Sequence, residues 1–496
     1  MDRIGLGRGT RKGRANGVMR PDFTVQPGGE GTVPRQRSTK RDSTAIHAGK
    51  RGEYSLREHP ASIGPADVVV FLIPCLQFVR ITVIGVLNGS DMALLAVFLY
   101  LAVRGRLRIA TAVGKWTLIL CSFWLASQCV TDIVRHSAFA DYARGWSNIG
   151  LTFVTLAVLW TLLYGRTQRL VFFGWGLVVG NVLLFLINPP KALVGASEEF
   201  AWKFVYAYSV SLGLFLIASR KEFRGLWPIT LAVVIGAINI LLGSRSMGGV
   251  CLAAALYLLV THVSRGEGAG RSKLKAGTAV ALAASILLSV AGVLWGYGRA
   301  ASSGILGADA EQKYERESSG KYGVLLGGRT ELLASLPAIY DSPILGHGSW
   351  AKDPSYIIGQ HRALLLLGYR AVGKLVTLDE LRYGLIPAHS YLFQAWVDAG
   401  ILGAVFWGWI LLLTARVIMR VNPTTTELLP VVSFLAFLLL WNIPFSPYGT
   451  DGRLTFPYTL VMLMTFTDMA FHKAARAPAN NAKRKIKTAL IPRPQH

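Results

Sequence analysis

The stretch "IPAHSYLFQAWVDAGILGAVFWGWILLL" (residues 386–413) joins a polar start, which holds His389, to a long apolar run. A run of about 17–25 apolar residues is long enough to cross the hydrocarbon layer of a bilayer. Such runs recur along most of the chain. The 496 residues are 52% hydrophobic and 16% charged, and their mean hydropathy of +0.42 excludes an ordinary soluble domain. We therefore predict an all-α polytopic membrane protein.

The apolar runs predict about twelve transmembrane helices and one large extracytoplasmic loop that contains short helices. The spans are expected at 67–87, 89–103, 112–131, 146–165, 169–188, 204–219, 226–243, 247–264, 277–297, 390–415, 428–446 and 454–472. Arg80 and the sequence "NGSD" from Asn88 interrupt the first pair. The chain is thus expected to divide into 1–65 (a tail), 66–297 (nine spans), 298–389 (the loop), 390–472 (three spans) and 473–496 (a second tail).

The formal net charge of +25 is concentrated partly in the two tails. Residues 1–65 hold 13 Lys and Arg against 6 Asp and Glu, and their Gly, Pro, Ser and Thr content is typical of a disordered segment. Residues 473–496 hold seven Lys and Arg and no acid. Neither tail interleaves aromatic residues with its charges as a nucleic-acid-binding module does. We expect cytoplasmic tails that lie against anionic membrane lipids, and no nucleic-acid partner.

The basic loops give the expected orientation. Five loops that alternate through the span order are basic: "RGRLR" from Arg104, "GRTQR" from Gly165, "RKEFRG" from Arg220, "SRGEGAGRSKLK" from Ser264 and "ARVIMRVN" from Ala415. Because cytoplasmic loops carry an excess of Lys and Arg, these five are predicted to face the cytoplasm. Both termini are then cytoplasmic, and the long segment at 298–389 faces outward.

The long outer segment shows helical periodicity in two places. One stretch, "RTELLASLPAIY", starts at Arg329 and is ended by "DSP" at Asp341. The other, "HRALLLLGYRAVGKLV", starts at His361, and its apolar positions suit a helix on the membrane surface or over the helix bundle. His389 closes the segment, so we expect it on the outer side, at the mouth of the tenth span.

Several basic residues are predicted on this outer side, against the usual charge bias: Arg144, Lys203, Arg245, Arg329 and Arg453. Arginine suits two-pronged binding of phosphate, so these residues could hold a lipid-linked phosphate or pyrophosphate at headgroup level. The alternative for each is an extended side chain that reaches lipid phosphates, or an ion pair with a nearby acid. Glycines beside Arg245 and Arg329 permit close backbone approach and favour binding there.

His389 has two possible roles. It follows Pro387, where a helix can begin, and precedes Ser390, a candidate N-cap. A neutral imidazole beside the positive end of a helix can act as a base. Its ring could equally form only a hydrogen bond to a backbone group, and spacing alone leaves both readings open.

Three motifs in order carry a family resemblance: "GSRSMGG" from Gly243, "GGRTELLASLPAIYDSPILGHGSW" from Gly327, and "AHSYLFQAWVDAGILGAVFWGW" from Ala388. This succession resembles the O-antigen ligase and O-antigen polymerase superfamily of bacterial envelope glycan enzymes. The resemblance covers about residues 66–472, with distinctive motifs within 240–405. Ser390 stands where the family usually has asparagine, which is one departure from its pattern.

The resemblance implies metal-independent, inverting glycosyl transfer at the periplasmic face of the bacterial inner membrane. The donor would be a glycan on undecaprenyl pyrophosphate, held by Arg245 and Arg329, and His389 would position or deprotonate the attacking sugar hydroxyl. The weaker candidates for the site are Arg144, Lys203, His347 and Arg453. No cluster of His, Asp and Glu has metal-ligand spacing, so neither a metal nor another cofactor is expected.

The sequence does not decide which molecule accepts the glycan. Another lipid-linked glycan would make the protein a polymerase of exopolysaccharide or O-antigen, and a lipid A core would make it an O-antigen ligase. A lipid-linked oligosaccharide flippase is an alternative of another class, but such transporters show related halves and charged or broken helices near the membrane midplane. A non-catalytic scaffold that recruits partners through the N-terminal tail is a third reading.

Overall fold

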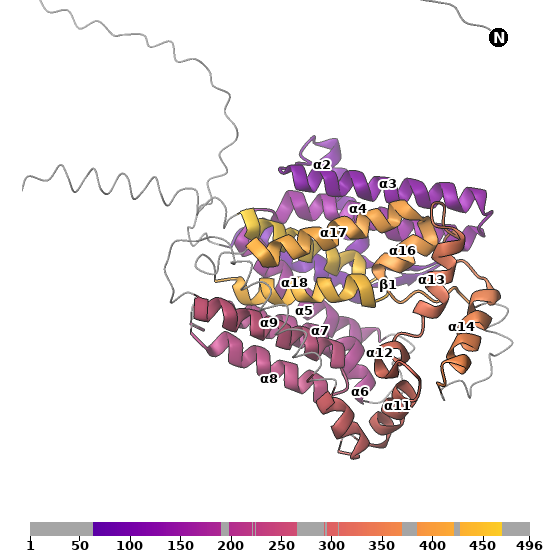
Figure 1. Cartoon of the computed structure of the whole chain (residues 1–496). Coiled ribbons are helices and arrows are strands. Elements are labelled where there is room, and N and C mark those ends of the chain that lie inside the picture. The colour runs from indigo at the N-terminus through magenta and orange to yellow at the C-terminus, as the bar shows by residue number, and fades with distance from the viewer. Residues whose placement is uncertain are drawn as a thin grey trace, which may run out of the picture. The chain divides into compact units, whose positions relative to one another are not determined.

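The computed structural model describes residues 63–189, 198–220, 222–223, 225–264, 292, 295–305, 307–369, 384–420 and 427–468. The tail at 473–496, nearly all of that at 1–65 and most of the predicted span at 277–297 lie outside these residues. Backbone contacts divide the chain into Met1–Tyr54 and Ser55–His496, and all the described residues belong to the second unit. This unit is mostly helical (Figure 1).

Within the described residues, five helices are long and apolar enough to cross a membrane: α3 (Ala112–Val134), α4 (Phe139–Leu163), α5 (Thr167–Ile187), α9 (Arg245–Ser264) and α17 (Ile401–Arg420). The shorter apolar helices include α1 (Pro65–Cys75), α2 (Gly89–Val103), α7 (Ala207–Ala218), α8 (Trp227–Leu241) and α18 (Leu429–Phe445). A short helix, α6 (Glu198–Ala201), and one turn of π-helix, η3 (Trp202–Tyr206), lead into α7. Residues 452–468 are also helical. The prediction of a helical membrane protein is therefore confirmed at this level.

The first predicted span, 67–87, is not one helix. α1 ends at Cys75, a single 3-10 turn, η1 (Leu76–Phe78), follows, and the chain then forms a hairpin of β1 (Arg80–Thr82) and β2 (Val86–Asn88). The strands are antiparallel, with Arg80 opposite Asn88. The β-branched and apolar residues of this stretch suit a strand as well as a helix, so hydrophobicity alone did not separate the two.

The predicted span at 390–415 is also broken. α16 (Tyr391–Ala399) and α17 meet at Gly400, whose φ of +67° lies in the left-handed region. A Cβ at Gly400 would lie 1.9 Å from the carbonyl oxygen of Ile344. The backbone of the preceding loop thus packs against the break, and only glycine leaves room for it.

Four helices form most of the described part of the predicted outer segment: α11 (Ala308–Ser318), α12 (Gly323–Gly327), α13 (Leu332–Asp341) and α14 (Pro354–Leu366). They gather at one end of the long helices (Figure 1). α13 confirms the helix predicted to end at Asp341. α14 begins earlier than predicted, because Asp353 caps its first turn by accepting from the backbone N–H of Ser355. Residues 370–383 of the second predicted stretch lie outside the described residues.

One large apolar core joins the long helices. α1 packs against α5, α8 against α9, α18 against α9, and α17 against α3. An aromatic cluster runs through the middle, and in it the ring of Tyr391 lies 4.8 Å from that of Trp407 and 5.0 Å from that of Tyr448. These contacts hold the first residue of α16, and with it the neighbouring His389, in a defined position.

Candidate functional site

Five ionisable residues gather where α9, α11–α13, α16 and α18 meet: Arg245, Glu317, Arg329, Glu331 and His389. We refer to them as the arginine–histidine cluster. The three residues that sequence reasoning ranked highest, Arg245, Arg329 and His389, all belong to it. Helices and the segments that lead into them, from distant parts of the sequence, therefore supply one cluster.

Arg329 is positioned by the glycines that precede it. α12 ends at Gly327, and a Cβ there would lie 2.0 Å from the carbonyl oxygen of Glu317. Because glycine has no Cβ, the end of α11 can pack directly against this turn. The sequence "GGR" thus brings the backbone of Glu317 next to the segment that carries Arg329.

The guanidinium of Arg329 lies over aromatic rings of α18. Its Cζ is 5.5 Å from the ring centre of Trp441 and 5.3 Å from that of Phe445, both within the range of cation–π attraction. Burial lowers the pKa of Arg329; the charges of Glu331 and Glu317 act in the opposite direction. The two rings offer no conventional hydrogen-bond acceptor, so the guanidinium N–H groups must donate to other partners.

Arg245 is the first residue of α9, whereas the predicted span begins two residues later, at 247. Its guanidinium makes two parallel contacts with Glu317, of 3.0 and 3.2 Å. The ring of Tyr297 lies 4.4 Å from its Cζ. The positive charge of Arg245 repels that of Arg329 and contributes to the lowered pKa of Arg329. An anion held between the two arginines would meet both positive charges.

His389 stands just before α16. Ser390 caps that helix, since its Oγ accepts from the backbone N–H of Phe393 at 3.1 Å, and this confirms the predicted N-cap. The same hydroxyl donates to the carbonyl of Ile443 at 2.8 Å, which ties α16 to the end of α18. The imidazole is 53% exposed, and its Nδ1 lies 3.9 Å from Oε1 of Glu331.

A small hollow connects these groups. Its lining includes Arg329, Glu331, Ser335, His389, Ser390 and Phe445. A guanidinium, a carboxylate and an imidazole therefore face the same space. This combination can bind an anion, orient a hydroxyl and accept its proton.

Two of the weaker candidates have protein partners at the same end. Arg144 lies within α4, which begins before the predicted span at 146–165; it pairs with Asp141 at 3.6 Å and donates to the carbonyl of Ile84. Lys203 lies in η3, with its Nζ 4.9 Å from the ring centre of Phe204. Neither residue lines the hollow beside His389.

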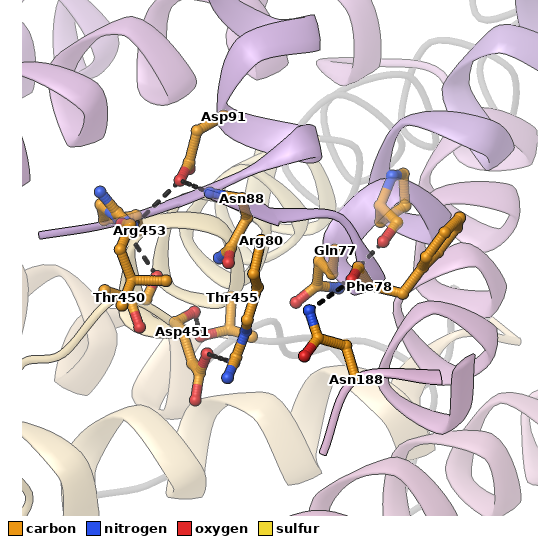
Figure 2. Close-up of polar contacts among 12 residues, drawn as sticks. Gln77, Phe78, Arg80, Asn88, Asp91, Asn188, Thr450, Asp451, Arg453 and Thr455 are labelled. Atoms are coloured by element: carbon orange, nitrogen blue, oxygen red, sulfur yellow. Dashed lines mark hydrogen bonds and ion pairs between the residues drawn. The ribbon is translucent and has the colours of Figure 1, made fainter. Parts of the chain in front are cut away.

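Arg453 forms a buried ion pair with Asp91, shown in Figure 2. The two side chains are 3% and 2% exposed, and their closest charged atoms are 3.0 Å apart. Arg453 also donates to the carbonyl of Val86 at 2.7 Å. Its guanidinium is thus engaged in joining the hairpin and α2 to the last described helix.

His347 belongs to a loop that anchors the outer helices. Its Nε2 lies 2.7 Å from the carbonyl oxygen of Ala338, and its backbone N–H donates to Val397. Next to it, Ser349 donates from both its N–H and its hydroxyl to the carboxylate of Asp132 at the end of α3, at 2.6 Å each. These contacts hold the loop on the bundle.

Sequence reasoning did not select Glu317 or Glu331 as site residues. Glu331 follows Arg329 by two positions, and an acid so close to a candidate arginine was the available signal. Glu317 lies in a charged stretch without a distinguishing pattern. Their roles depend on contacts with other helices, which one sequence does not reveal.

Comparison of the chain with protein-family models finds no match, and comparison with curated proteins finds no significant match.

Proposed function

We propose that this protein is a glycosyltransferase of the bacterial inner membrane that acts on undecaprenyl-pyrophosphate-linked glycans, as the O-antigen ligases and polymerases do. One observation carries the proposal. Arg329 and His389 line a single hollow, and the ion pair of Arg245 with Glu317 lies close enough for both charges to act on Arg329. A donor pyrophosphate needs such cations, and an attacking hydroxyl needs such a base.

The proposed topology has twelve spans, cytoplasmic termini and a periplasmic segment at 298–389. In support, α9 begins at Arg245 in the cluster and ends at Ser264, where a basic segment starts. α17 likewise runs from the break beside the outer helices to Arg420. The basic segments thus follow the helix ends opposite the cluster, as the positive-inside rule expects for a periplasmic site.

In the proposed reaction, an acceptor hydroxyl oxygen attacks the anomeric carbon of the donor sugar as the bond from that carbon to the pyrophosphate oxygen breaks. The electron pair leaves with undecaprenyl pyrophosphate, and Arg245 and Arg329 stabilise its negative charge. The hydroxyl proton passes to Nε2 of His389. Because Nδ1 faces Glu331, that carboxylate can stabilise the imidazolium that forms. Attack opposite the leaving group inverts the anomeric configuration.

Glu317 holds Arg245 in place through two contacts. In this mechanism the donor pyrophosphate displaces the carboxylate of Glu317 and takes its place at the guanidinium of Arg245. The planar guanidinium can bind either group in a bidentate manner, since carboxylate and phosphate present similar pairs of oxygens.

The test uses purified full-length protein in lipid nanodiscs with an undecaprenyl-pyrophosphate oligosaccharide and EDTA. A ladder of products on a gel identifies a polymerase, and transfer only after addition of lipid A core identifies a ligase. If neither product forms although the donor is bound, the proposed reaction is wrong.

Replacement of the base tests the assigned chemistry. His389→Ala is expected to lower the transfer rate by about 10²–10⁴-fold, the usual contribution of a general base. His361→Ala, which removes an imidazole from α14 outside the hollow, is the matched control. Full activity of His389→Ala would contradict the assignment of His389 as the general base.

A further inference from the structure

A second, larger cavity lies next to the hollow beside His389. Its volume is about 430 Å³, within the range of small-molecule sites. Its lining comes from the hairpin, α5, η3, the first residues of α7, α9 and α16, the end of α18 and the segment that follows α18. The mechanism proposed above uses none of its side chains.

The two spaces share a wall of adjacent residues. His389 and Ser390 line the hollow, whereas the next residue, Tyr391, lines the cavity. At the end of α18, Phe445 lines the hollow and Asn442 lines the cavity. A molecule in the cavity is therefore placed beside the base.

The cavity combines aromatic rings with polar groups. Phe185, Phe204 and Phe456 contribute rings, and Asn181 and Asn442 contribute amides. Amides offer both donors and acceptors, which a purely hydrocarbon ligand does not use.

Two buried hydrogen-bond donors in this lining are unsatisfied. Within the described part of the chain, neither Nε of Arg80 nor the hydroxyl of Tyr208 has a hydrogen-bond partner. A buried polar group without a partner costs about 1–3 kcal/mol, so such groups call for an explanation. Both atoms have almost no accessible surface, so a ligand reaches them once the two side chains turn toward the cavity, and a ligand that supplies acceptor oxygens then satisfies both.

The charge at the cavity mouth favours a neutral ligand. Arg80 pairs with Asp451 at 3.7 Å, and Figure 2 shows the two side chains meeting. The Asp451 side chain is 72% exposed, so an incoming ligand meets its carboxylate. That carboxylate would repel a phosphate, but it can accept hydrogen bonds from hydroxyl groups. Sugar hydroxyls donate to Asp451 and accept from Arg80 and Tyr208.

We propose that this cavity binds a neutral sugar unit, and that the sugar belongs to the acceptor glycan. The second half of the proposal rests on the proposed function, since it requires a reaction at His389. The sugar enters past Asp451, its ring lies among the phenylalanines, and its oxygens meet Arg80 and Tyr208.

The first experiment measures binding alone. The probes are octyl β-D-glucoside, below its micelle concentration, and octyl phosphate, each added to the protein in nanodiscs with empty nanodiscs as background. We expect saturable binding of the glucoside and weaker binding of the phosphate. Absence of saturable glucoside binding, or stronger binding of the phosphate, overturns the proposal.

Tyr208→Phe locates the binding. It removes a hydroxyl that has no partner among the described residues, so the fold keeps its hydrogen bonds. We expect about 3–10-fold weaker glucoside binding, as for loss of one hydrogen bond. Tyr142→Phe, in α4 outside the cavity, is the control. Equal binding by Tyr208→Phe and wild-type protein contradicts the assignment.

The second experiment tests the acceptor role during turnover. Tyr208→Phe is expected to raise KM for the acceptor while KM for the lipid-linked donor stays unchanged. A rise in donor KM instead contradicts the acceptor role. If wild-type protein transfers no glycan, the proposed function and the acceptor role both fail, whereas sugar binding in the cavity is judged from the glucoside data alone.

Discussion

Two carboxylates at the same end of the molecule differ in how completely they are bonded. Asp132, at the end of α3, is 2% exposed and accepts from the N–H and hydroxyl of Ser349, from the hydroxyl of Ser137 and from the indole of Trp146, at 2.6–2.8 Å. The Glu331 side chain is 30% exposed, and the imidazole of His389 lies 3.9 Å from it. A carboxylate whose hydrogen-bonding capacity is filled by the protein stabilises the structure. A carboxylate with unfilled capacity can still interact with a ligand.

The same contrast divides one continuous motif, "GGRTELLASLPAIYDSPILGHGSW". Its first part supplies Arg329 and Glu331 to the cluster. Its last part supplies Ser349 to Asp132. Gly145 of α4 makes room for this anchor, since a Cβ there would lie 2.0 Å from the hydroxyl of Ser349. One motif can thus contain both a candidate site and the support that positions it.

The largest effect on stability is expected at the anchor. Asp132→Ala leaves the buried donors of Ser349 and Trp146 without their acceptor, which should lower the free energy of unfolding by about 3–4 kcal/mol. Thermal unfolding of the purified protein measures the change. Glu222→Ala, which removes an exposed surface carboxylate, should leave the melting temperature almost unchanged. A similar small change for Asp132→Ala would erase the contrast.

Loss of a cluster arginine should act on turnover and not on stability. Arg329→Ala is expected to lower kcat by about 10²–10³-fold, because one charge-stabilising group is lost from the transition state. Arg329→Lys should recover only part of the rate, since lysine lacks the planar fork that lies over Trp441 and Phe445. Steady-state kinetics and melting temperature are both recorded, with the exposed Arg316→Ala as control. A large drop in melting temperature would instead assign Arg329 to the anchor.

A smaller effect is expected where a carboxylate competes with the donor. Glu317→Gln weakens the pairing with Arg245, so KM for the lipid-linked donor should fall by about 3–10-fold, as for release of an ion pair of roughly 1 kcal/mol. Glu315→Gln, on an exposed position of α11, is the matched variant. If KM rises in Glu317→Gln alone, Glu317 orients Arg245 and does not compete.

The smallest effect concerns the cap beside His389. Ser390→Ala removes an N-cap and should lower the free energy of unfolding by about 1 kcal/mol. Ser390→Asn should stay close to wild type, because asparagine is an equally good cap. Chemical denaturation compares the two variants. An equal loss in both would mean that the hydrogen bond to Ile443 matters more than the cap.

Local sequence signals predicted the helices well. Apolar runs identified the long helices, "DSP" marked the end of α13 at Asp341, and Ser390 was recognised as a cap. These features depend on neighbouring residues, since helical periodicity and capping act within a few positions of the chain. The candidate residues Arg245, Arg329 and His389 were also visible, through glycines and a helix start.

Contacts between distant segments set the rest. The apolar run through Gly400 gave no sign of a break, because the break depends on the backbone of Ile344. The hairpin that replaces half of the first predicted span is likewise held by distant contacts, such as that of Arg80 with Asp451. Long-range packing chooses between helix and strand where local preference is weak.

The amino-acid sequence alone therefore specified a helical membrane protein and pointed to three residues of the candidate site, because burial in lipid imposes long apolar runs and leaves ionisable residues conspicuous. The tertiary structure determined which charged groups are fully bonded within the protein and which can still bind a ligand. Asp132 and Arg453 are fully engaged inside the protein, whereas Glu331 and His389 are partly exposed beside a hollow. Whether a polar group finds all its hydrogen-bond partners depends on other helices, and no local sequence pattern encodes it.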